Sequence, residues 1–210
     1  MKKLFLTSSF SQVGEKLLDI LPRPSNEMTV VFIPTAADPY EDKWFVDRDR
    51  EKLVSLGFKN IIELSLKDSL KRELEETLEK ADIIFVGGGN TFYLLEKARS
   101  SGFTEVASKF LEKGVIYIGS SAGSYLACPT IEAAGWKHGD RNVNGLKDLT
   151  ALNLVPFLMS VHYDSKYDDV LRESIAGTKF SVKILTDTQA VVVLGDDTKL
   201  VGEGEEIIFA

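Results

Sequence analysis

One stretch of the chain, residues 115–130, constrains the fold more than any other. It reads V-I-Y-I-G-S-S-A-G-S-Y-L-A-C-P-T, and its first four residues have the apolar, largely β-branched or aromatic composition of a short buried strand. The pattern breaks at Gly119 and resumes as a helix over residues 122–127. The sequence therefore predicts a strand that turns directly into a helix, as strands do in α/β folds.

The turn between this strand and helix contains the pattern G-x-S-x-G, with Gly119, Ser121 and Gly123 at its fixed places. Such a pattern holds a serine hydroxyl on a tight turn, where larger neighbours would collide with the backbone. The following helix would direct its N-terminal amides at whatever Ser121 attacks. The motif alone is weak, but its position between a strand and a helix favours a nucleophilic serine over a Gly/Ser-rich turn without chemistry.

Length and composition predict one α/β domain, spanning residues 1–210, with a core on both faces of its sheet. The net charge of -7 and the absence of a basic cluster make nucleic acid and anionic membranes poor partners. A single cysteine, Cys128, excludes an internal disulfide. We expect a cytoplasmic protein, since the sequence has no apolar run of transmembrane length and no signal-peptide pattern.

The rest of the chain alternates between strand and helix patterns. It predicts a three-layer α/β fold with a mostly parallel sheet, helices on both faces and hairpin strands at the C-terminal end. The long polar segment 132–148 is expected to be a loop that borders a site. Helices are expected from Ser8 or Ser9 to Leu21 and over 41–56, 70–78, 92–98, 105–112 and 167–176, and strands over 3–7, 28–33, 60–64, 83–86, 181–185, 190–194, 198–201 and 206–209.

A nucleophilic serine needs a base, usually a histidine, within hydrogen-bond reach. The chain has two histidines. His162 follows the apolar stretch 152–161, at the expected C-terminal end of a strand, which is the sheet edge where the serine turn lies. His138 lies in the polar loop K-H-G-D-R-N. We therefore favour His162 as the base.

The imidazole in turn needs a carboxylate that fixes its tautomer. Asp187 is the favoured candidate, because it lies in a turn between two strand patterns and can reach the same sheet edge. Asp164 is only two residues from His162, too close along the chain to face its ring easily. Asp140 and Asp148 belong to the long loop. The sequence leaves the choice among these carboxylates open.

Acyl transfer also needs two amides directed at the developing oxyanion. One is expected from Ala122, directly after the serine, and the other from the triplet Gly87-Gly88-Gly89, which lies between a strand and a helix. A glycine triplet could instead cradle a phosphate, but neither nucleotide-binding glycine motif is present. Because two separated histidines and a lone cysteine match no ligand spacing, we expect no metal and no cofactor.

With these residues assembled, the chain resembles peptidase E, the aspartyl dipeptidase family of serine peptidases, whose wider relatives include the cyanophycinases. Three blocks carry the resemblance: F-V-G-G-G-N-T-F-Y-L-L (85–95), Y-I-G-S-S-A-G-S-Y-L-A-C-P-T-I (117–131), and L-N-L-V-P-F (152–157), which leads to His162. The resemblance implies a fold like that of the class I glutamine amidotransferases, with Ser121 where those enzymes carry cysteine.

The same resemblance implies Ser121 as nucleophile, His162 as base, and the amides of Gly88 and Ala122 as the oxyanion hole. Two departures concern the substrate pocket. Family members can carry an aspartate shortly after P-T-I, where this chain has A-G-W and its nearest aspartate is Asp140. The third member of the family's triad is a glutamate, and the matching position here is Asp187, one methylene shorter.

The function expected is therefore a serine exopeptidase that cleaves short peptides, with N-terminal aspartate as the candidate first residue. An acidic side chain requires a basic pocket, for which the candidates are Lys137, Arg141 and Arg172. The alternatives are a catalytically silent module that binds peptides or amino acids, and another acyl hydrolase such as an esterase or a cyanophycinase-like enzyme. A homo-oligomer is compatible with the sequence but is not indicated by it.

Overall fold

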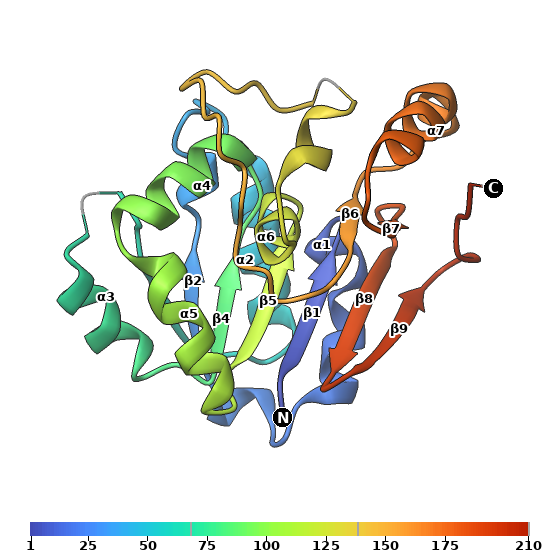
Figure 1. The fold of residues 1–210 in the computed structure, drawn as a ribbon. Helices are drawn as coiled ribbons and strands as arrows, with labels where there is room; N and C mark the ends of the chain where they lie inside the picture. Colours follow the sequence, from blue (N-terminus) through green and yellow to red (C-terminus); the bar gives the residue numbers. More distant parts are fainter. Residues whose placement is uncertain (68, 138, 210) are drawn as a thin grey trace.

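The structure, a computed structural model, describes residues 1–67, 69–137 and 139–209. Its centre is a sheet of seven strands: β1 (Lys3–Thr7), β2 (Thr29–Ile33), β3 (Asn60–Glu63), β4 (Ile83–Val86), β5 (Ile116–Ser120), β8 (Gln189–Leu194) and β9 (Asp197–Gly202). Their order is β3-β2-β4-β5-β1-β8-β9 (Figure 1). The first five in that order are parallel, and β8 and β9 continue the sheet as an antiparallel hairpin.

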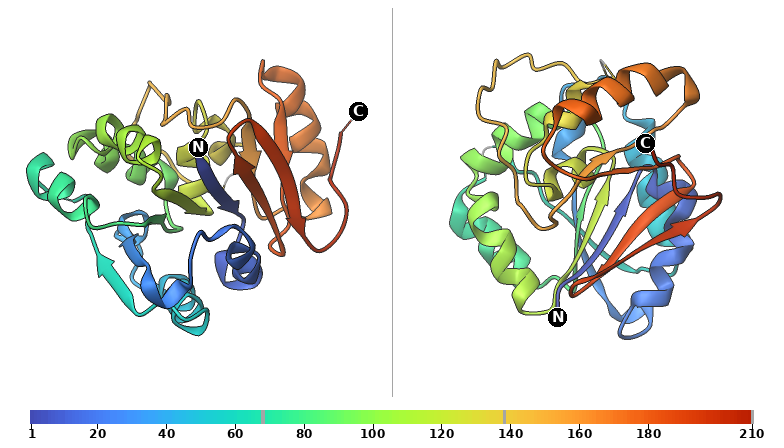
Figure 2. Two further views of the ribbon diagram at one scale, coloured as in Figure 1. Left: turned by 90° about the horizontal axis from the view of Figure 1, so that it is seen from below. Right: turned by 45° about the vertical axis from the view of Figure 1, so that its right-hand side comes forward.

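Helices cover both faces of this sheet (Figure 2). Their bounds are α1 Phe10–Val13, α2 Trp44–Ser55, α3 Lys71–Leu78, α4 Thr91–Ser100, α5 Phe103–Glu112, α6 Ala122–Ala127 and α7 Asp168–Gly177. Alternate residues of β2 enter different cores: Val30 and Phe32 pack with α1 and α2, whereas Val31 and Ile33 pack with α3 to α6. This alternation follows from the two-residue period of a strand. The expected three-layer α/β fold is confirmed.

The expected hairpin at the C-terminal end is present as β8 and β9, and the segment before it forms a second, two-stranded sheet. It consists of β6 (Leu158–Ser160) and β7 (Val182–Ile184), which are parallel. The helix between them, α7, makes the segment a strand-helix-strand unit, and such a crossover brings its two strands together in parallel. The expected strand 206–209 is reduced to one bridge between Ile207 and Ile184.

The N-terminal helix also differs from its expectation. The pattern from Ser8 or Ser9 to Leu21 predicts one helix, whereas α1 has four residues and continues as a 3₁₀ segment, Gly14–Ile20. Glycine has a low helix propensity, and Gly14 packs so closely that a Cβ there would lie 3.0 Å from Lys52 Cγ. Ser9 occupies the N-cap position without a side-chain capping bond.

The arrangement of the strands brings several loops to one edge of the sheet. Strand β5 lies between β4 and β1, and all three are parallel. Their C-terminal ends therefore meet, which places the segments after them side by side. Among the described residues, no helix combines the length and apolar composition needed to cross a membrane.

Candidate active site

Ser121 occupies a strained turn between β5 and α6. Its backbone has φ 50° and ψ -105°, a conformation that non-glycine residues rarely adopt and that clusters at functional sites. The two flanking glycines make the turn possible. A Cβ on Gly119 would lie 2.7 Å from backbone atoms of Gly123, and a Cβ on Gly123 would lie 2.0 Å from the carbonyl oxygen of Val86. The close contact of α6 with β4 and β5 thus requires both glycines of the motif.

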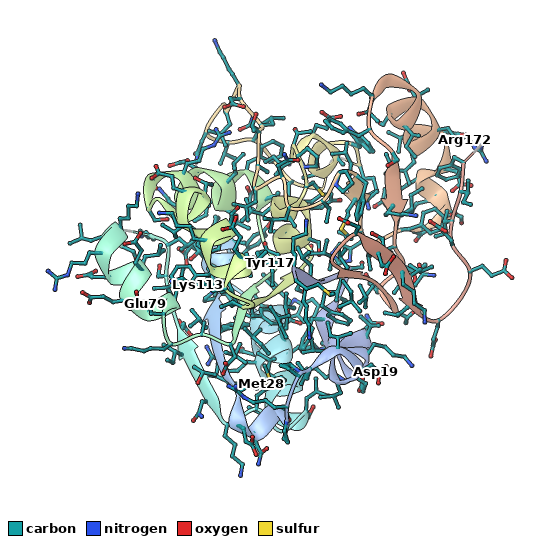
Figure 3. All side chains as sticks on the ribbon, turned by 60° about the horizontal axis from the view of Figure 1, so that its bottom comes forward. Asp19, Met28, Glu79, Lys113, Tyr117 and Arg172 are labelled. Atoms are coloured by element: carbon teal, nitrogen blue, oxygen red, sulfur yellow. The ribbon has the colours of Figure 1, made fainter. Side chains whose placement is uncertain are left out.

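Below this turn, the side chain of Tyr117 supports α6 from the sheet. Tyr117 lies in the interior of the molecule (Figure 3) and its hydroxyl donates a 2.7 Å hydrogen bond to the Gly123 carbonyl. Ser124 bonds similarly to the ends of two strands, since its hydroxyl lies 2.7 Å from the Thr7 oxygen and 2.9 Å from the Gly119 oxygen. These bonds anchor the start of α6, and therefore Ser121, to the C-terminal ends of β1 and β5.

The imidazole of His162 lies between Ser121 and Asp187. Its Nε2 is 2.9 Å from Ser121 Oγ, and its Nδ1 is 2.5 Å from Asp187 Oδ1. The His162 and Asp187 side chains are each about half exposed. This is the geometry by which a carboxylate orients an imidazole toward a serine hydroxyl.

The parallel pairing of β6 and β7 accounts for this contact. Ser160 pairs with Ile184, so the residues that follow the two strands emerge at the same end. The Tyr163 amide continues the pairing by donating to the Leu185 oxygen at 2.9 Å. Two segments that are 25 residues apart in the sequence thereby bring His162 and Asp187 together.

The other three carboxylates considered for the third position bond elsewhere. Asp164 accepts from the Lys166 amide and pairs with its ammonium group at 3.2 Å. Asp148 pairs with Arg99 at 3.1 Å. Asp140 accepts a 2.8 Å bond from the Thr91 amide.

The pKa of Asp187 lies below its ordinary value, chiefly because of the hydrogen bond with His162 and also because of one from Ser8. His138 lies outside the described residues.

Ser8, expected only as a helix cap, is part of this cluster. It is fully buried at the end of β1. Its hydroxyl donates to Asp187 Oδ1 at 2.7 Å, accepts from the His162 amide at 2.7 Å, and lies 3.2 Å from His162 Nδ1. The helical pattern after Ser8 explained this residue as a helix cap, so its contact with Asp187 and His162 was not expected. Its position directly after a parallel strand, at the edge shared with Ser121, was the signal that could have indicated the contact.

The glycine triplet after β4 borders Ser121. A Cβ on Gly88 would lie 3.4 Å from the Ser121 Cβ, and Gly89 has φ +137° with its Cα packed against Ala36, where a Cβ would lie 2.1 Å from the carbonyl oxygen. Gly87 and Asn90 donate their amides to Ile33 and Ala36. Within the described chain, the Gly88 amide has no such acceptor, and the Ala122 amide begins α6, where helices leave amides unpaired.

Two pockets flank Ser121. The large pocket has a volume of about 380 Å³ and the small pocket about 120 Å³. The small pocket is lined by Ser121, Tyr125, Ala134, Lys137, Gly139, Asp140, His162 and Tyr167. The large pocket is lined by Ser8, Ser9, Ser11, Gln12, Tyr40, Trp44, Phe45, Arg48, Asp49, Gly88, Gly89, Ser120, Ser121, His162 and Asp187. The loop expected to border a site thus contributes four residues to the small pocket.

Of the three basic candidates, Lys137 alone lines either pocket. Its ammonium group donates to the carbonyl oxygens of Val161 and His162, and burial lowers its pKa to about 8. Arg172 lies on α7 at the outer edge of the molecule (Figure 3), with its guanidinium 4.5 Å from the Phe209 ring. Arg141 is exposed. Among the three candidates that the sequence left open, the structure thus favours Lys137, because the loop and α7 place Arg141 and Arg172 on the surface.

The large pocket contains charged residues that the sequence did not suggest. Arg48 and Asp49 come from α2. Asp49 is 5% exposed, and burial raises its pKa to about 7, although bonds from the Ser120 hydroxyl and the Ser11 amide oppose this rise. The sequence showed these residues only as part of a charged helix. Among the described residues, no group of three or more His, Cys, Asp or Glu side chains could hold a metal ion.

Comparison with known proteins places this chain in a family. The model of peptidase family S51 matches residues 4–201. The chain belongs to peptidase family S51. It is 33% identical to an uncharacterized peptidase of Pasteurella multocida, over 96% of this chain and 97% of that protein. It is also 33% identical to peptidase E of Salmonella newport, over 77% of this chain and 69% of that protein.

The fold agrees with this family assignment. A crystal structure of a Listeria monocytogenes EGD-e protein, described as a candidate peptidase E, superimposes with a TM-score of 0.86 and 29% identity, covering 97% of this chain and all of the other. The resemblance to peptidase E is thereby confirmed, and the chain is a serine peptidase, a hydrolase of the peptidase E type.

Proposed function

We propose that this S51 peptidase is an exopeptidase that cleaves short peptides by acyl transfer through Ser121, His162 and Asp187. One observation carries the proposal: the His162 ring lies 2.9 Å from Ser121 Oγ through Nε2 and 2.5 Å from Asp187 through Nδ1. Serine requires such a base because its hydroxyl is a weak nucleophile at neutral pH. The strained turn at Ser121, called the elbow below, supports the same role, since Ser121 lines both pockets.

In the first half of the reaction, Ser121 Oγ attacks the carbonyl carbon of the scissile bond and its proton passes to His162 Nε2. Asp187 stabilises the resulting imidazolium. The amides of Gly88 and Ala122 are proposed to stabilise the oxyanion, as unpaired donors beside the nucleophile. His162 then protonates the leaving amine, and the acyl group stays on Ser121. In the second half, His162 deprotonates a water molecule, which attacks the acyl carbon. The bond from that carbon to Ser121 Oγ then breaks, His162 returns the proton to Oγ, and the acyl group leaves as a carboxylic acid.

The small pocket is proposed to bind the N-terminal residue of the peptide. It combines a cationic side chain, Lys137, with a carboxylate, Asp140. Such a pair complements an amino acid that carries an α-ammonium group and an acidic side chain. Burial raises the pKa of Asp140, and a bound ammonium group would favour its ionised form. N-terminal aspartate is therefore the first substrate to test.

The test is hydrolysis of a panel of dipeptides with acidic, neutral and basic first residues, together with chromogenic aspartyl amides. Ser121→Ala should abolish turnover down to weak residual hydrolysis. The matched control is Ser108→Ala, an exposed serine on α5. A serine-directed phosphonate should label the wild type and not Ser121→Ala.

A second pair of variants tests the role of Asp187 as the third member of the proposed triad. Asp187→Asn should lower kcat by roughly 10³- to 10⁴-fold, because the amide no longer selects the correct tautomer of His162. Asp164→Asn is the matched control and should stay close to wild type. If neither peptides nor amides turn over and no phosphonate labels Ser121, the proposal is wrong. Equal thermal stabilisation of wild type and Ser121→Ala by peptides, without turnover, would indicate a silent binding module.

A further inference from the structure

We propose that the large pocket is the subsite for the leaving residue, and that it selects dipeptides whose second residue is apolar or aromatic and carries a free carboxylate. This inference rests on the proposed function, since it assumes that the peptide extends across Ser121. Nothing in the family assignment or in the names of the relatives specifies such a preference. The pocket volume of about 380 Å³ is within the range of small-ligand sites.

Three aromatic rings form one wall of this pocket. Tyr40 and Trp44 are 40% and 55% exposed, and both pack edge-on against Phe45, with ring centroids 5.9 and 5.8 Å apart. Phe45 holds the other two rings in place, because it contacts both. Exposed aromatic rings that gather at the mouth of a cavity are costly in water and mark binding surfaces. This wall would cover an apolar or aromatic side chain.

A cation lies at the edge of the same wall. Arg48 follows Trp44 by one helical turn, so both project from the same face of α2. Its guanidinium lies 4.9 Å from the centre of the Trp44 ring, and no carboxylate of the described chain forms an ion pair with it. A guanidinium that stacks on an aromatic ring keeps its N–H donors for a planar carboxylate, which it binds in a bidentate manner.

The assignment to the leaving side follows from how the two pockets differ. Both include Ser121 and His162, so a peptide that places its scissile bond at Ser121 has one residue on each side. The small pocket contains the Lys137 and Asp140 pair proposed to bind the N-terminal residue. The second residue therefore enters the large pocket, where Arg48 is the one lysine or arginine side chain among the described lining residues and is the candidate to bind its carboxylate. A longer peptide or a C-terminal amide would not offer that charge.

The experiment measures kcat/KM for Asp-Phe, Asp-Leu, Asp-Gly and the amide of Asp-Phe. In the wild type, Asp-Phe should exceed both Asp-Gly and its own amide by about tenfold. Trp44→Ala should reduce the value for Asp-Phe about tenfold and that for Asp-Gly less than twofold. Arg48→Gln should remove the preference for the free acid over the amide. Thermal melting checks that each variant folds.

Two substitutions provide matched controls. Val54→Ala changes an exposed apolar residue on the same helix, and Arg72→Gln changes an exposed arginine on α3. Both lie outside the large pocket and should leave the selectivity unchanged. If Trp44→Ala affects all second residues equally, or instead alters the preference for the first residue, the inference is wrong.

A binding measurement separates this inference from the proposed function. Calorimetry on Ser121→Ala, with Asp-Phe, Asp-Gly and the amide of Asp-Phe, reports the pocket's preference without turnover. Tighter binding of Asp-Phe that is lost in the Ser121→Ala, Trp44→Ala double variant would support the subsite even if the wild type hydrolyses nothing. Equal affinities for the three ligands, unaffected by the second substitution, would overturn the subsite even if the wild type is an active peptidase.

Discussion

At the scale of residues, one buried hydroxyl, that of Ser8, links Asp187 and His162 in the candidate site. Ser8, at the end of β1, contacts the carboxylate of Asp187 and both the backbone and the ring of His162. His162 has a positive φ of 55°, and its amide donates a hydrogen bond to this hydroxyl. The central sheet and the smaller β6–β7 sheet are thus connected at the atoms that orient the imidazole.

We predict that Ser8→Ala lowers kcat by roughly 10- to 100-fold with little change in KM. The loss leaves the His162 amide without its acceptor and removes one bond from Asp187, which also costs about 1–3 kcal/mol of stability. Steady-state kinetics and urea unfolding measure the two effects. Ser25→Ala is the control, because its hydroxyl also donates one hydrogen bond, to the Leu56 backbone oxygen, but lines neither pocket. A Ser8→Ala variant with unchanged kcat would contradict the role.

At the scale of elements, close contacts between neighbours set the position of the elbow. Helix α6 approaches β4 so closely that Gly123 has no room for a side chain beside the Val86 carbonyl. The obstacle is backbone rather than a flexible side chain, so the structure cannot relax without separating α6 from the sheet. On the opposite face, the carboxylate of Asp49 on α2 accepts a 3.1 Å bond from the Ser11 amide and ties α2 to the start of α1.

We expect Gly123→Ala to destabilise the protein by at least about 3 kcal/mol, or to prevent folding, because the added methyl would overlap the Val86 oxygen. Gly177→Ala at the end of α7 is the matched control. A Cβ there meets nothing within 4 Å, so its effect should stay within about 0.5 kcal/mol. Urea denaturation of both variants tests this, and similar stabilities would refute the packing argument.

Asp49 should make stability depend on pH. Its folded pKa is raised to about 7 by burial, from 3.8, so the folded state holds a proton that the unfolded state releases. The stabilisation that the folded state gains from holding this proton is complete below about pH 4 and is lost as the pH rises through about 7. From pH 5 to pH 8, the free energy of unfolding of Asp49→Asn should therefore rise relative to that of the wild type by on the order of 3 kcal/mol. Unfolding curves at both pH values measure the difference, and a constant difference would exclude this explanation.

At the scale of the whole molecule, buried hydrophobic side chains form two cores, one on each face of the sheet. Cys128 is the one cysteine in the sequence. It is fully buried in the core formed with α3 to α6, and burial raises the pKa of its thiol to about 12. Both features suppress thiolate formation, and the thiolate is the reactive form.

We predict that Cys128 reacts with thiol reagents only when the whole molecule unfolds. At pH 8 the native protein should remain unlabelled, and labelling should rise with urea along the same curve as tryptophan fluorescence. The buried position makes local opening insufficient. Rapid labelling without denaturant, or labelling that precedes the fluorescence change, would show that the core around Cys128 opens independently.

The sequence by itself determined the features that depend on residues adjacent in the chain. The passage from β5 through Ser121 into α6 and the triplet after β4 are encoded in single segments by apolar runs and glycines. The alternating pattern also determined the fold class, because strands covered on both faces and separated by helices build a parallel sheet. It also favoured His162 as the base, although β6, which His162 follows, belongs to the second sheet and not to the strands that end beside Ser121.

Only the tertiary structure decided which distant groups meet. The contacts of Ser8 with Asp187, the parallel pairing of β6 with β7, and the position of Trp44 and Arg48 in the same pocket as Ser121 join segments separated by many residues. A local pattern describes which face of an element is apolar, but it contains no term for the element that will pack there. The surface positions of Arg141 and Arg172, and the burial of Asp49, depend on that packing in the same way.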